Sequence, residues 1–410
     1  MTGGSGARRV VVTGHGVVSS VGIGVDNFWS SLRRGTCGIG PIKSFPLQDL
    51  YITIASEVRD FDPRERCTSK PLMLADRYSQ FAGSAAIEAM TQAGFKGRLA
   101  NGDRAASIVG SGVGGLGTME KGYEDLFIHK KKATHPLTLL RTIGSSAAAH
   151  VSIEYGITGP CFGTVSACST AAHAIGLAYQ MIRHGMVDIG VAGASEACIT
   201  FAAMRSWQAM RVLSPEGCFP FAKRRNGTVL AEGSGILVLE ALEHAQARGA
   251  KPIAELVGFA MTSDAGDMVN PSIEGPTKAM QLALADAKLS PGDIQYINAH
   301  GTATTVNDIN ETGAIRRVFG KHAETVSVSS TKSMHGHCLG AGGGVEAVVC
   351  IKAMEDGFVP ATIGFDEPGE GCDLDYTPNE GRERPITYAM SNSFAFGGLN
   401  AVLVFGPSPI

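Results

Sequence analysis

The sequence predicts an α/β protein with mostly parallel sheets, organised as two similar halves. Apolar runs of strand length recur along the chain and lack the polar alternation of half-exposed strands, so they indicate strands buried on both faces. Helical segments lie between these runs. The stretches VSACSTAAHAIGLA and VSSTKSMHGHCLGAGGGVEA also share one order of strand, polar turn and small-residue helix. We therefore expect the chain to divide into residues 1–252 and 253–410.

The first expected strand is RRVVVTG, residues 8–14, which ends in a turn because Gly14, His15 and Gly16 interrupt the apolar run. A signal peptide is the alternative for this segment, and the same interruption argues against it. Six later apolar runs are expected to be strands: 105–110, 187–195, 235–242, 294–300, 325–330 and 400–406.

Helices are expected over 168–184 and 308–319, because Gly185 and Gly320 directly follow them as C′ caps. No low-complexity linker interrupts the alternation of these helices with the apolar runs. Such alternation is typical of α/β folds.

The composition argues against several classes of protein. The chain has 410 residues, of which 44% are hydrophobic and 18% charged, and its formal net charge is −3. This balance does not favour general binding to nucleic acid, and no apolar run approaches the roughly 18 residues that a membrane span needs. Nine irregularly spaced cysteines without a CxxC pair argue against a disulfide framework or a cysteine zinc site. We therefore expect a cytoplasmic protein.

Cys168 lies in TVSACSTAAHAIG, where an apolar strand gives way to a helix of small residues. At the amino terminus of a helix, unpaired N–H groups and the helix dipole stabilise a thiolate. The position therefore suits a nucleophile whose pKa is lowered. The alternative is a buried structural cysteine, which is what most cysteines are.

Two further segments carry histidines. NAHGTATTVND places His300 at the carboxyl end of an apolar strand, the edge at which open α/β sheets bind ligands, although a turn histidine bonded to backbone is equally compatible. SSTKSMHGHCLGAGG carries Lys332, His335 and His337, and three interpretations are open. In the first, the two histidines of this segment are metal ligands, although such a site would lack a nearby carboxylate. In the second, Ser329 and Lys332 are a serine–lysine pair, although the companion motifs of that pair are absent. In the third, a histidine and the lysine serve the pocket of the cysteine.

The segment SNSFAFGGLN, residues 391–400, is expected to form a tight turn between two strands. Its Phe394 and Phe396 are either core residues or part of a gate that also offers a backbone N–H donor.

The glycines of GSGVGGLG match the dinucleotide fingerprint GxGxxG after a strand, but the following FIHKKKATHP supplies basic residues where that site needs an acidic one. We interpret these glycines, Gly110, Gly112 and Gly115, as a turn that lines a pocket.

Together these motifs occur in the order found in β-ketoacyl-[acyl-carrier-protein] synthases. The chain resembles the type II condensing enzymes of the thiolase superfamily, a group that includes fatty-acid, nodulation-type and type II polyketide ketosynthases. The resemblance extends from RRVVVTG to NAVLVFG. It implies a five-layer α-β-α-β-α fold of two pseudo-repeated halves, the first holding the nucleophile and the second holding two catalytic histidines.

The resemblance also implies a reaction, the decarboxylative Claisen condensation of an acyl thioester on Cys168 with malonyl-carrier protein. Cys168 would be the acylated nucleophile, His300 and His337 the pair whose N–H groups hold the enolate oxygen, and Lys332 the cation beside them. The backbone N–H groups of Cys168 and Phe396 would form the oxyanion hole, and Phe396 would gate the acyl pocket.

Substrate and carrier contacts are implied in the same way. Thr302 and Thr304 would contact the pantetheine arm, and Val113 and Phe394 would help to bind substrate. The segment SKPLMLADR lacks the basic residues expected for carrier docking. That role is therefore assigned to four basic residues elsewhere: Lys130, Lys131, Lys132 and Arg211.

Several segments depart from the housekeeping pattern. His335 stands where the family often has Thr or Gly, FPFA replaces RPFD, and SWQAMRVL, which carries Trp207, and HPLTLLRT differ around the acyl pocket. The last two segments look more like those of nodulation-type synthases and type II polyketide ketosynthases, and they favour a specialised polyketide or signal-lipid pathway.

The partners implied are acyl- and malonyl-loaded carrier protein and a second subunit, with no nucleic acid, membrane, metal or other cofactor. Family members are dimers, so we expect a homodimer or a heterodimer with a chain-length factor, formed around the strand VDIGVAGAS. The alternative function is a non-catalytic chain-length-factor-like subunit, although such subunits usually lack the nucleophile. A thiolase would need a second cysteine near the carboxyl end, where SNSFAFGG has none.

Overall fold

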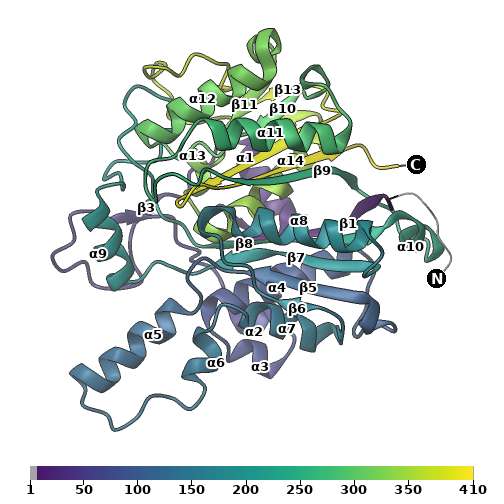
Figure 1. The fold of residues 1–410 in the computed structure, drawn as a ribbon. Helices are drawn as coiled ribbons and strands as arrows, with labels where there is room; N and C mark the ends of the chain where they lie inside the picture. The colour runs from purple at the N-terminus through teal and green to yellow at the C-terminus, as the bar shows by residue number, and fades with distance from the viewer. Residues whose placement is uncertain (1–6, 410) are drawn as a thin grey trace.

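Two five-stranded sheets form the framework of the computed structural model, which describes residues 7–409 (Figure 1). The first sheet contains, in spatial order, β6 (Cys161–Phe162), β5 (Ala105–Gly110), β7 (Ile189–Glu196), β8 (Gly233–Ala241) and β1 (Val10–Ser19). The second contains β9 (Ala254–Ser263), β15 (Leu399–Gly406), β14 (Ala389–Ala395), β10 (Tyr296–Asn298) and β11 (Ser327–Ser329). The two sheets join where β1 and β9 pair over two residues each, Val11 with Glu255 and Val12 with Ala254.

Both sheets are mixed, so the expectation of mostly parallel sheets is wrong. β5 is parallel to β6 and β7, and β10 is parallel to β11 and β14. The pairs β7–β8, β8–β1, β14–β15 and β15–β9 are antiparallel. An apolar run shows that both faces of a strand are covered, but it carries no information about strand direction. The second sheet repeats the order and directions of the first, as expected for two pseudo-repeated halves.

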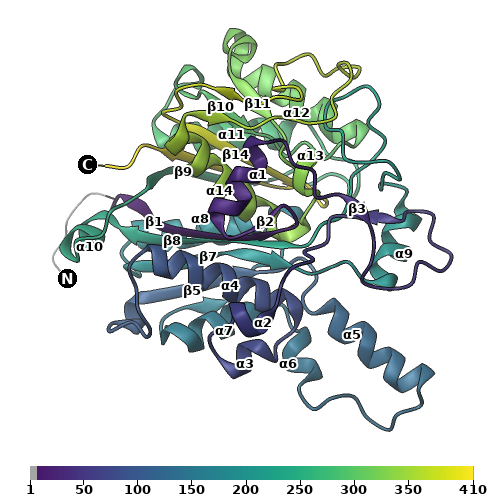
Figure 2. The ribbon, with the colours of Figure 1, turned by 180° about the vertical axis from the view of Figure 1, so that it is seen from behind.

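Helices cover both outer faces and fill the space between the sheets (Figures 1 and 2). The outer face of the first sheet packs against α4 (Arg77–Gln92) and α7 (Ser146–Tyr155). The middle layer, between the two sheets, consists of α8 (Thr170–Arg183) and α14 (Gly342–Asp356). The outer layer on the second sheet consists of α11 (Glu274–Ala287) and α12 (Thr305–Phe319). This arrangement confirms the five-layer α-β-α-β-α fold.

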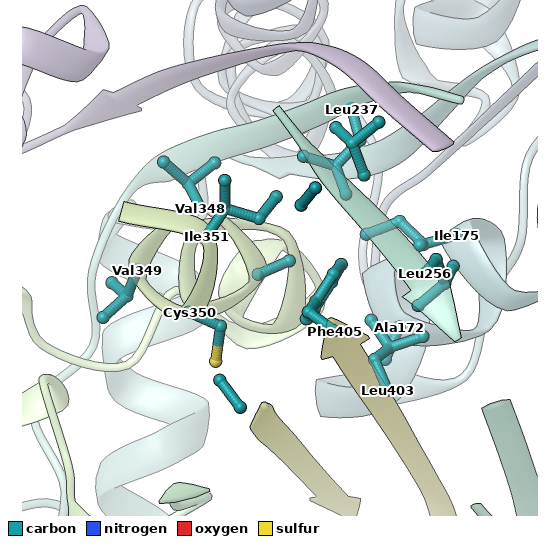
Figure 3. Packing of buried hydrophobic residues seen from close by; sticks show 14 of the residues in the cluster. Ala172, Ile175, Leu237, Leu256, Val348, Val349, Cys350, Ile351, Leu403 and Phe405 are labelled. Carbon is teal, nitrogen blue, oxygen red and sulfur yellow. The ribbon is translucent and has the colours of Figure 1, made fainter. Parts of the chain in front are cut away.

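The middle layer is the core of the molecule. Figure 3 shows residues of α8 and α14 packed among side chains from β8, β9 and β15. Because α14 has a sheet or a helix on nearly every side, its residues from Gly342 to Ile351 are all buried, and Glu346 is the one charged residue among them. Gly235 of β8 is required for this approach, since a Cβ there would lie 2.1 Å from the carbonyl carbon of Gly344.

The first strand is longer than expected. β1 continues to Ser19, through the Gly14–Gly16 segment that was expected to form a turn, with an irregularity in pairing between Val12 and Gly14. Both glycines face α4: a Cβ on Gly14 or Gly16 would lie 2.0 Å from the carbonyl oxygen of Ala89 or Ala85. These glycines therefore allow close packing of strand and helix and do not end the strand.

The expected helices begin slightly differently. A 3₁₀ turn over Ala167–Ser169 precedes α8, and α12 begins at Thr305. Gly185 follows the end of α8 with φ 74°, as expected for a C′ glycine. The boundary expected between residues 252 and 253 falls between α10 (Leu242–Ala247) and β9.

The remaining elements are short or peripheral. They are β2 (Gly22–Ile23), α1 (Val25–Arg33), β3 (Gly40–Pro41), β4 (Ile54–Ala55), α2 (Pro63–Arg66), α3 (Lys70–Met73), α5 (Leu116–Tyr123), α6 (Thr138–Thr142), α9 (Phe201–Met210), α13 (Lys332–His335), β12 (Phe358–Val359) and β13 (Arg382–Glu383). The segment with α5 and α6 projects away from the layers (Figure 1). Within residues 7–409, none of the helices has both the length and the apolar character to cross a membrane.

Candidate active site

Cys168 lies in the 3₁₀ turn that leads into α8, and several hydrogen bonds fix this turn. The residue before it, Ala167, has φ 47°, in the left-handed region that non-glycine residues rarely adopt. The Thr170 hydroxyl donates to the carbonyl of Ala167 at 2.7 Å, and the Ser169 hydroxyl donates to the carbonyl of Leu399 at 2.7 Å. The turn is therefore held in a strained conformation and tied to the β14–β15 hairpin.

Two histidines from the second half of the chain converge on Cys168. His300 follows β10 and His337 follows β11 and α13, so both lie at the carboxyl ends of parallel neighbouring strands. Nε2 of His337 is 3.1 Å from Sγ, and the sulfur and one nitrogen of each ring lie within 4.8 Å of one another. The ring centroids are 5.5 Å apart at 83°. The Glu311 carboxylate accepts the backbone N–H of His300 at 2.8 Å, and the Val229 carbonyl accepts that of His337 at 2.7 Å.

Both rings are neutral at neutral pH. Burial holds the pKa of His300 and of His337 well below 6.5, and the Lys332 cation lowers both pKa values further. Nδ1 of His337 has no hydrogen-bond partner among the described residues. A proton there would be an unpaired buried donor, which is costly. The ring proton therefore belongs on Nε2, which faces the sulfur.

Lys332 is fully buried and forms an ion pair with Glu346 of α14. Burial raises the pKa of Glu346 to about 7, and the Lys332 cation opposes that rise. Lys332 does not line the cavity described below, so it acts on the pocket through its charge. That charge lowers the pKa of the Cys168 thiol as well as those of the two imidazoles.

The thiol itself is strongly desolvated. Burial raises the pKa of Cys168 to about 12, so the expectation that the helix terminus lowers this pKa overall is wrong. The Lys332 cation opposes the rise and the Glu196 anion adds to it. The backbone N–H groups of Phe396 and Cys168 also lower this pKa, because both interact with the sulfur. These two donors therefore converge at the nucleophile.

A cavity of about 290 Å³ reaches Cys168 and the two histidines. Its lining includes six polar residues, Asn226, Thr228, Asn270, Thr302, Thr304 and Asn307. It also includes six apolar residues, Trp207, Val212, Met268, Val269, Phe394 and Phe396. The rings of Trp207 and Phe396 pack at 6.1 Å between centroids beside the nucleophile. The cavity therefore offers both hydrogen-bonding and apolar side chains next to the nucleophile.

Two family descriptions match the chain in succession. They are Beta-ketoacyl synthase, N-terminal domain, over residues 7–245, and Beta-ketoacyl synthase, C-terminal domain, over residues 253–366. The chain belongs to the β-ketoacyl synthase family.

Relatives of the synthase are similar over almost their whole length. A nodulation protein E from Rhizobium leguminosarum bv. trifolii is 46% identical over 398 residues, which cover 97% of this chain and 99% of the relative. A 3-oxoacyl-[acyl-carrier-protein] synthase 2 from Coxiella burnetii is 42% identical and covers 97% and 98%.

Solved structures agree with this assignment. The ishigamide ketosynthase/chain length factor has 34% identity, a TM-score of 0.93 and coverage of 98% of the synthase and 100% of that chain. A type II polyketide ketosynthase in complex with its acyl-carrier protein, AntDE:AntF, has 34% identity, a TM-score of 0.89 and the same coverage.

The structure separates the three interpretations of the Lys332 segment. His335 of the synthase is buried outside the cavity, where its ring nitrogens bond to the Gly336 carbonyl at 2.8 Å and the Thr331 hydroxyl at 3.0 Å. It is therefore not placed to share a metal with His337. The Ser329 hydroxyl bonds to that of Tyr296 at 2.9 Å, while Lys332 is held by its glutamate. The geometry favours a lysine and a histidine that serve the cysteine.

The other predicted positions divide into two groups. Thr302, Thr304, Phe394, Phe396 and Arg211 line the cavity of the synthase, and the two threonine hydroxyls are 2.8 Å apart. Val113 does not line it, and neither do three exposed lysines between α5 and α6, Lys130, Lys131 and Lys132. The glycines Gly110, Gly112 and Gly115 were expected to form a turn that lines a pocket. Gly110 is the last residue of β5, Gly112 lies in the loop that follows, Gly115 directly precedes α5, and none of the three lines this cavity.

The segment 187–195, around which a dimer was expected to form, contains an interior strand of the first sheet. This strand is β7, which pairs with β5 on one side and β8 on the other, so it has no free edge. The outer strand of the first sheet is β6.

Sequence reasoning missed two buried carboxylates that hold the site, Glu311 and Glu346. Glu311 lies on the buried side of α12, and Glu346 interrupts the otherwise apolar GGGVEAVVCI of the largely buried α14. An ionisable residue inside such a run is a signal that could have identified it, since buried charges are almost always partnered.

The site also has the donors for a soft metal ion. A thiol and two imidazoles with ligand atoms within 4.8 Å of one another are the set that Zn²⁺ binds. Bound metal would occupy the sulfur and both ring nitrogens, and would therefore block the chemistry of a free thiol.

Proposed function

We propose that the chain condenses an acyl thioester with malonyl-carrier protein to give β-ketoacyl-carrier protein and CO₂, in a specialised polyketide or fatty-acid pathway. The observation that carries the proposal is the convergence of Cys168, His300 and His337 at the end of one cavity, with the His337 Nε2 3.1 Å from the sulfur. A chain-length-factor-like subunit would not need this set.

In the first step, Sγ of Cys168 attacks the acyl carbonyl carbon. The Sγ–C bond forms, the bond from that carbon to the carrier's sulfur breaks, and the thiol proton ends on the leaving sulfur. The backbone N–H groups of Cys168 and Phe396 already converge at the sulfur. They would stabilise the oxyanion of the tetrahedral intermediate.

In the second step, malonyl thioester loses its carboxylate as CO₂, and the electron pair of the broken C–C bond forms an enolate. The ring N–H groups of His300 and His337 donate to the enolate oxygen, so no strong base is needed. The enolate carbon then attacks the acyl carbon, and the electron pair of the Sγ–C bond returns to the sulfur of Cys168. Neutral imidazoles suit this role, and the depressed pKa values of both rings keep them neutral.

Lys332 supports both steps through its charge. A buried cation close to the pocket favours the thiolate and keeps the imidazoles from becoming protonated. Thr302 and Thr304 in the lining of the cavity would contact the amides of a pantetheine arm, while Phe396 would gate the acyl side and Phe394 would contact the substrate. Val113 belongs to the proposed acyl side, beyond the cavity.

Carrier docking and assembly are parts of the same proposal. Arg211 at the cavity and Lys130, Lys131 and Lys132 near α6 would receive an acidic carrier protein. Exposed apolar residues flank these lysines and β6 along the sequence: Tyr123, Phe127, Ile128, Leu139, Leu140, Ile143 and Val165. We propose that a second ketosynthase-type subunit, either a copy of this chain or a chain-length factor, covers these apolar residues and leaves the three lysines open to the carrier protein. Light scattering of the purified chain distinguishes the two, because only the first gives a dimer from this chain alone.

The test of the function is reconstitution. Purified chain is incubated with malonyl- and acyl-carrier protein, and CO₂ and the β-ketoacyl product are followed by mass spectrometry. Wild-type chain should form both, and Cys168→Ala should gain no acyl mass. Acylation that persists in this variant would overturn the role of Cys168, and absence of CO₂ with every acyl donor would favour the non-catalytic subunit. Fractionation of cells that express the tagged chain tests the proposed cytoplasmic location.

A further inference from the structure

Glu196 is a buried carboxylate that the proposed reaction does not use. It ends β7 and has no exposed surface. Its four hydrogen-bond donors are the hydroxyl of Ser111 and the backbone N–H groups of Gly112, Val113 and Gly340, at 2.7, 2.8, 3.4 and 3.0 Å. No cation pairs with it within the described chain. A buried carboxylate that accepts several hydrogen bonds holds the segments that carry its donors in fixed positions.

The donors come from two loops that belong to different halves of the chain. Gly112 lies in the loop after β5, and Gly340 lies in the turn between His337 and α14. The two loops touch at these glycines: a Cβ on Gly340 would lie 2.6 Å from the backbone nitrogen of Gly112 and 2.8 Å from Oε2 of Glu196. Gly112 is required at this contact, since a Cβ there would lie 2.8 Å from Oε2 of Glu196.

Both loops connect directly to the reacting groups. The backbone N–H of Ser111 donates to the Thr164 carbonyl at 3.3 Å, in the segment that leads to the nucleophile. Gly340 follows His337 by one short turn, whose Leu339 packs in the same apolar cluster as Cys168. A shift of this turn would therefore move the imidazole relative to the sulfur.

We propose that Glu196 is a positioning residue for the condensation. It holds the turn after His337 against the loop after β5, and in this way it fixes the position of the imidazole relative to the Cys168 sulfur. The inference rests on the proposed function for its kinetic consequence. Burial raises the pKa of Glu196 to about 7, and the hydrogen bonds from its four donors oppose that rise. The ionised carboxylate suits this role because it is acceptor-only and all four of its partners are donors. A glutamine would present an amide N–H₂ to one pair of these donors and leave them unpaired.

The test compares Glu196→Gln with a matched variant, Glu57→Gln. Glu57 is also a buried carboxylate that accepts backbone N–H groups, those of Lys43 and Ser44, but it does not contact the loops of the site. Misplacement of a reacting group by about 1 Å costs about 10²-fold in rate. We therefore expect Glu196→Gln to lower kcat for CO₂ release by about 10²-fold with little change in KM, and Glu57→Gln to keep the wild-type kcat.

A second measurement separates positioning from loss of folding. The charged groups that act on the Cys168 thiol are Lys332 and Glu196, and the anion raises its pKa. In Glu196→Gln the pH profile of Cys168 alkylation by iodoacetamide should therefore move to lower pH, while condensation becomes slower. A variant that was merely misfolded would not combine a more acidic thiol with a lower kcat.

The outcomes are distinct. A folded Glu196→Gln with wild-type kcat, an equal loss in Glu57→Gln, or an unshifted alkylation profile overturns the inference. If Glu196→Gln does not fold, Ser111→Ala, which removes one donor, decides: a severalfold lower kcat supports the positioning role and an unchanged kcat overturns it. If wild-type chain releases no CO₂ the proposed function fails, but the alkylation profiles still test the coupling of Glu196 to the site.

Discussion

His300→Ala should separate the two half reactions. The ring of His300 is one of two N–H donors to the enolate oxygen, and removal of one preorganised donor to a developing oxyanion costs about 10²–10³ in rate, or about 2.7–4 kcal/mol. Acylation uses the backbone N–H groups of Cys168 and Phe396, which the substitution leaves in place. Acylation should therefore fall by less than about tenfold, which corresponds to about 1.4 kcal/mol.

The substitution should not disturb the loop. The backbone N–H groups of His300 and Gly301 remain bound to Glu311 at 2.8 and 2.7 Å. His337→Ala should differ, because Nε2 of His337 contacts the sulfur at 3.1 Å, so both half reactions should become slower. His335→Gln is the matched control, since His335 is a buried histidine outside the cavity.

The assay measures each half reaction in single turnover. Acylation is followed as mass added to Cys168 with an acyl thioester, and decarboxylation as CO₂ released from malonyl-carrier protein. Wild-type CO₂ release by folded His300→Ala would refute the donor role. An equal loss of both half reactions would refute their separation.

Three further predictions concern stability and metal binding. His15 is buried, and neither of its ring nitrogens has a hydrogen-bond partner within residues 7–409. Burial lowers its pKa to about 4, so the unfolded chain binds the extra proton below pH 6.5, and the free energy of unfolding falls by up to about 3 kcal/mol between pH 6.5 and 4. His15→Leu should therefore raise Tm at pH 8 and raise it more at pH 5; an equal gain at both would contradict this. Gly235→Ala should lower Tm by at least several degrees, because its Cβ would meet the backbone of Gly344 at 2.1 Å, and a wild-type Tm would show that the two backbones can separate freely. Zn²⁺ should inhibit CO₂ release, and EDTA should restore it. The His300→Ala variant lacks one of the three ligands and should therefore bind Zn²⁺ more weakly than the wild-type chain in calorimetry. Equal affinity of the two proteins would exclude this ligand set.

The strands and helix ends of the fold could be predicted from the sequence. Buried strands can be identified from apolar runs such as AASIVG, and helix ends from Gly185, because these signals depend on neighbouring residues alone. Strand direction depends on which strand lies alongside, so the antiparallel pairing of β7 with β8 could not be predicted. The glycines of TGHG were misinterpreted for the same reason: they serve contact with α4, from a distant part of the sequence.

By itself, the sequence determined which residue types stand at strand and helix ends, and their order: a cysteine at the start of one helix, and histidines after two later strands. Only the tertiary structure decided that these groups meet, because Cys168 and His337 come from different halves of the chain. The packing of the two sheets around α8 and α14 brings Nε2 of His337 to 3.1 Å from Sγ of Cys168. It also decided their protonation. The helix terminus favours a thiolate, but desolvation of the buried sulfur is the stronger effect and raises the pKa of Cys168 to about 12, and burial depends on all the layers at once.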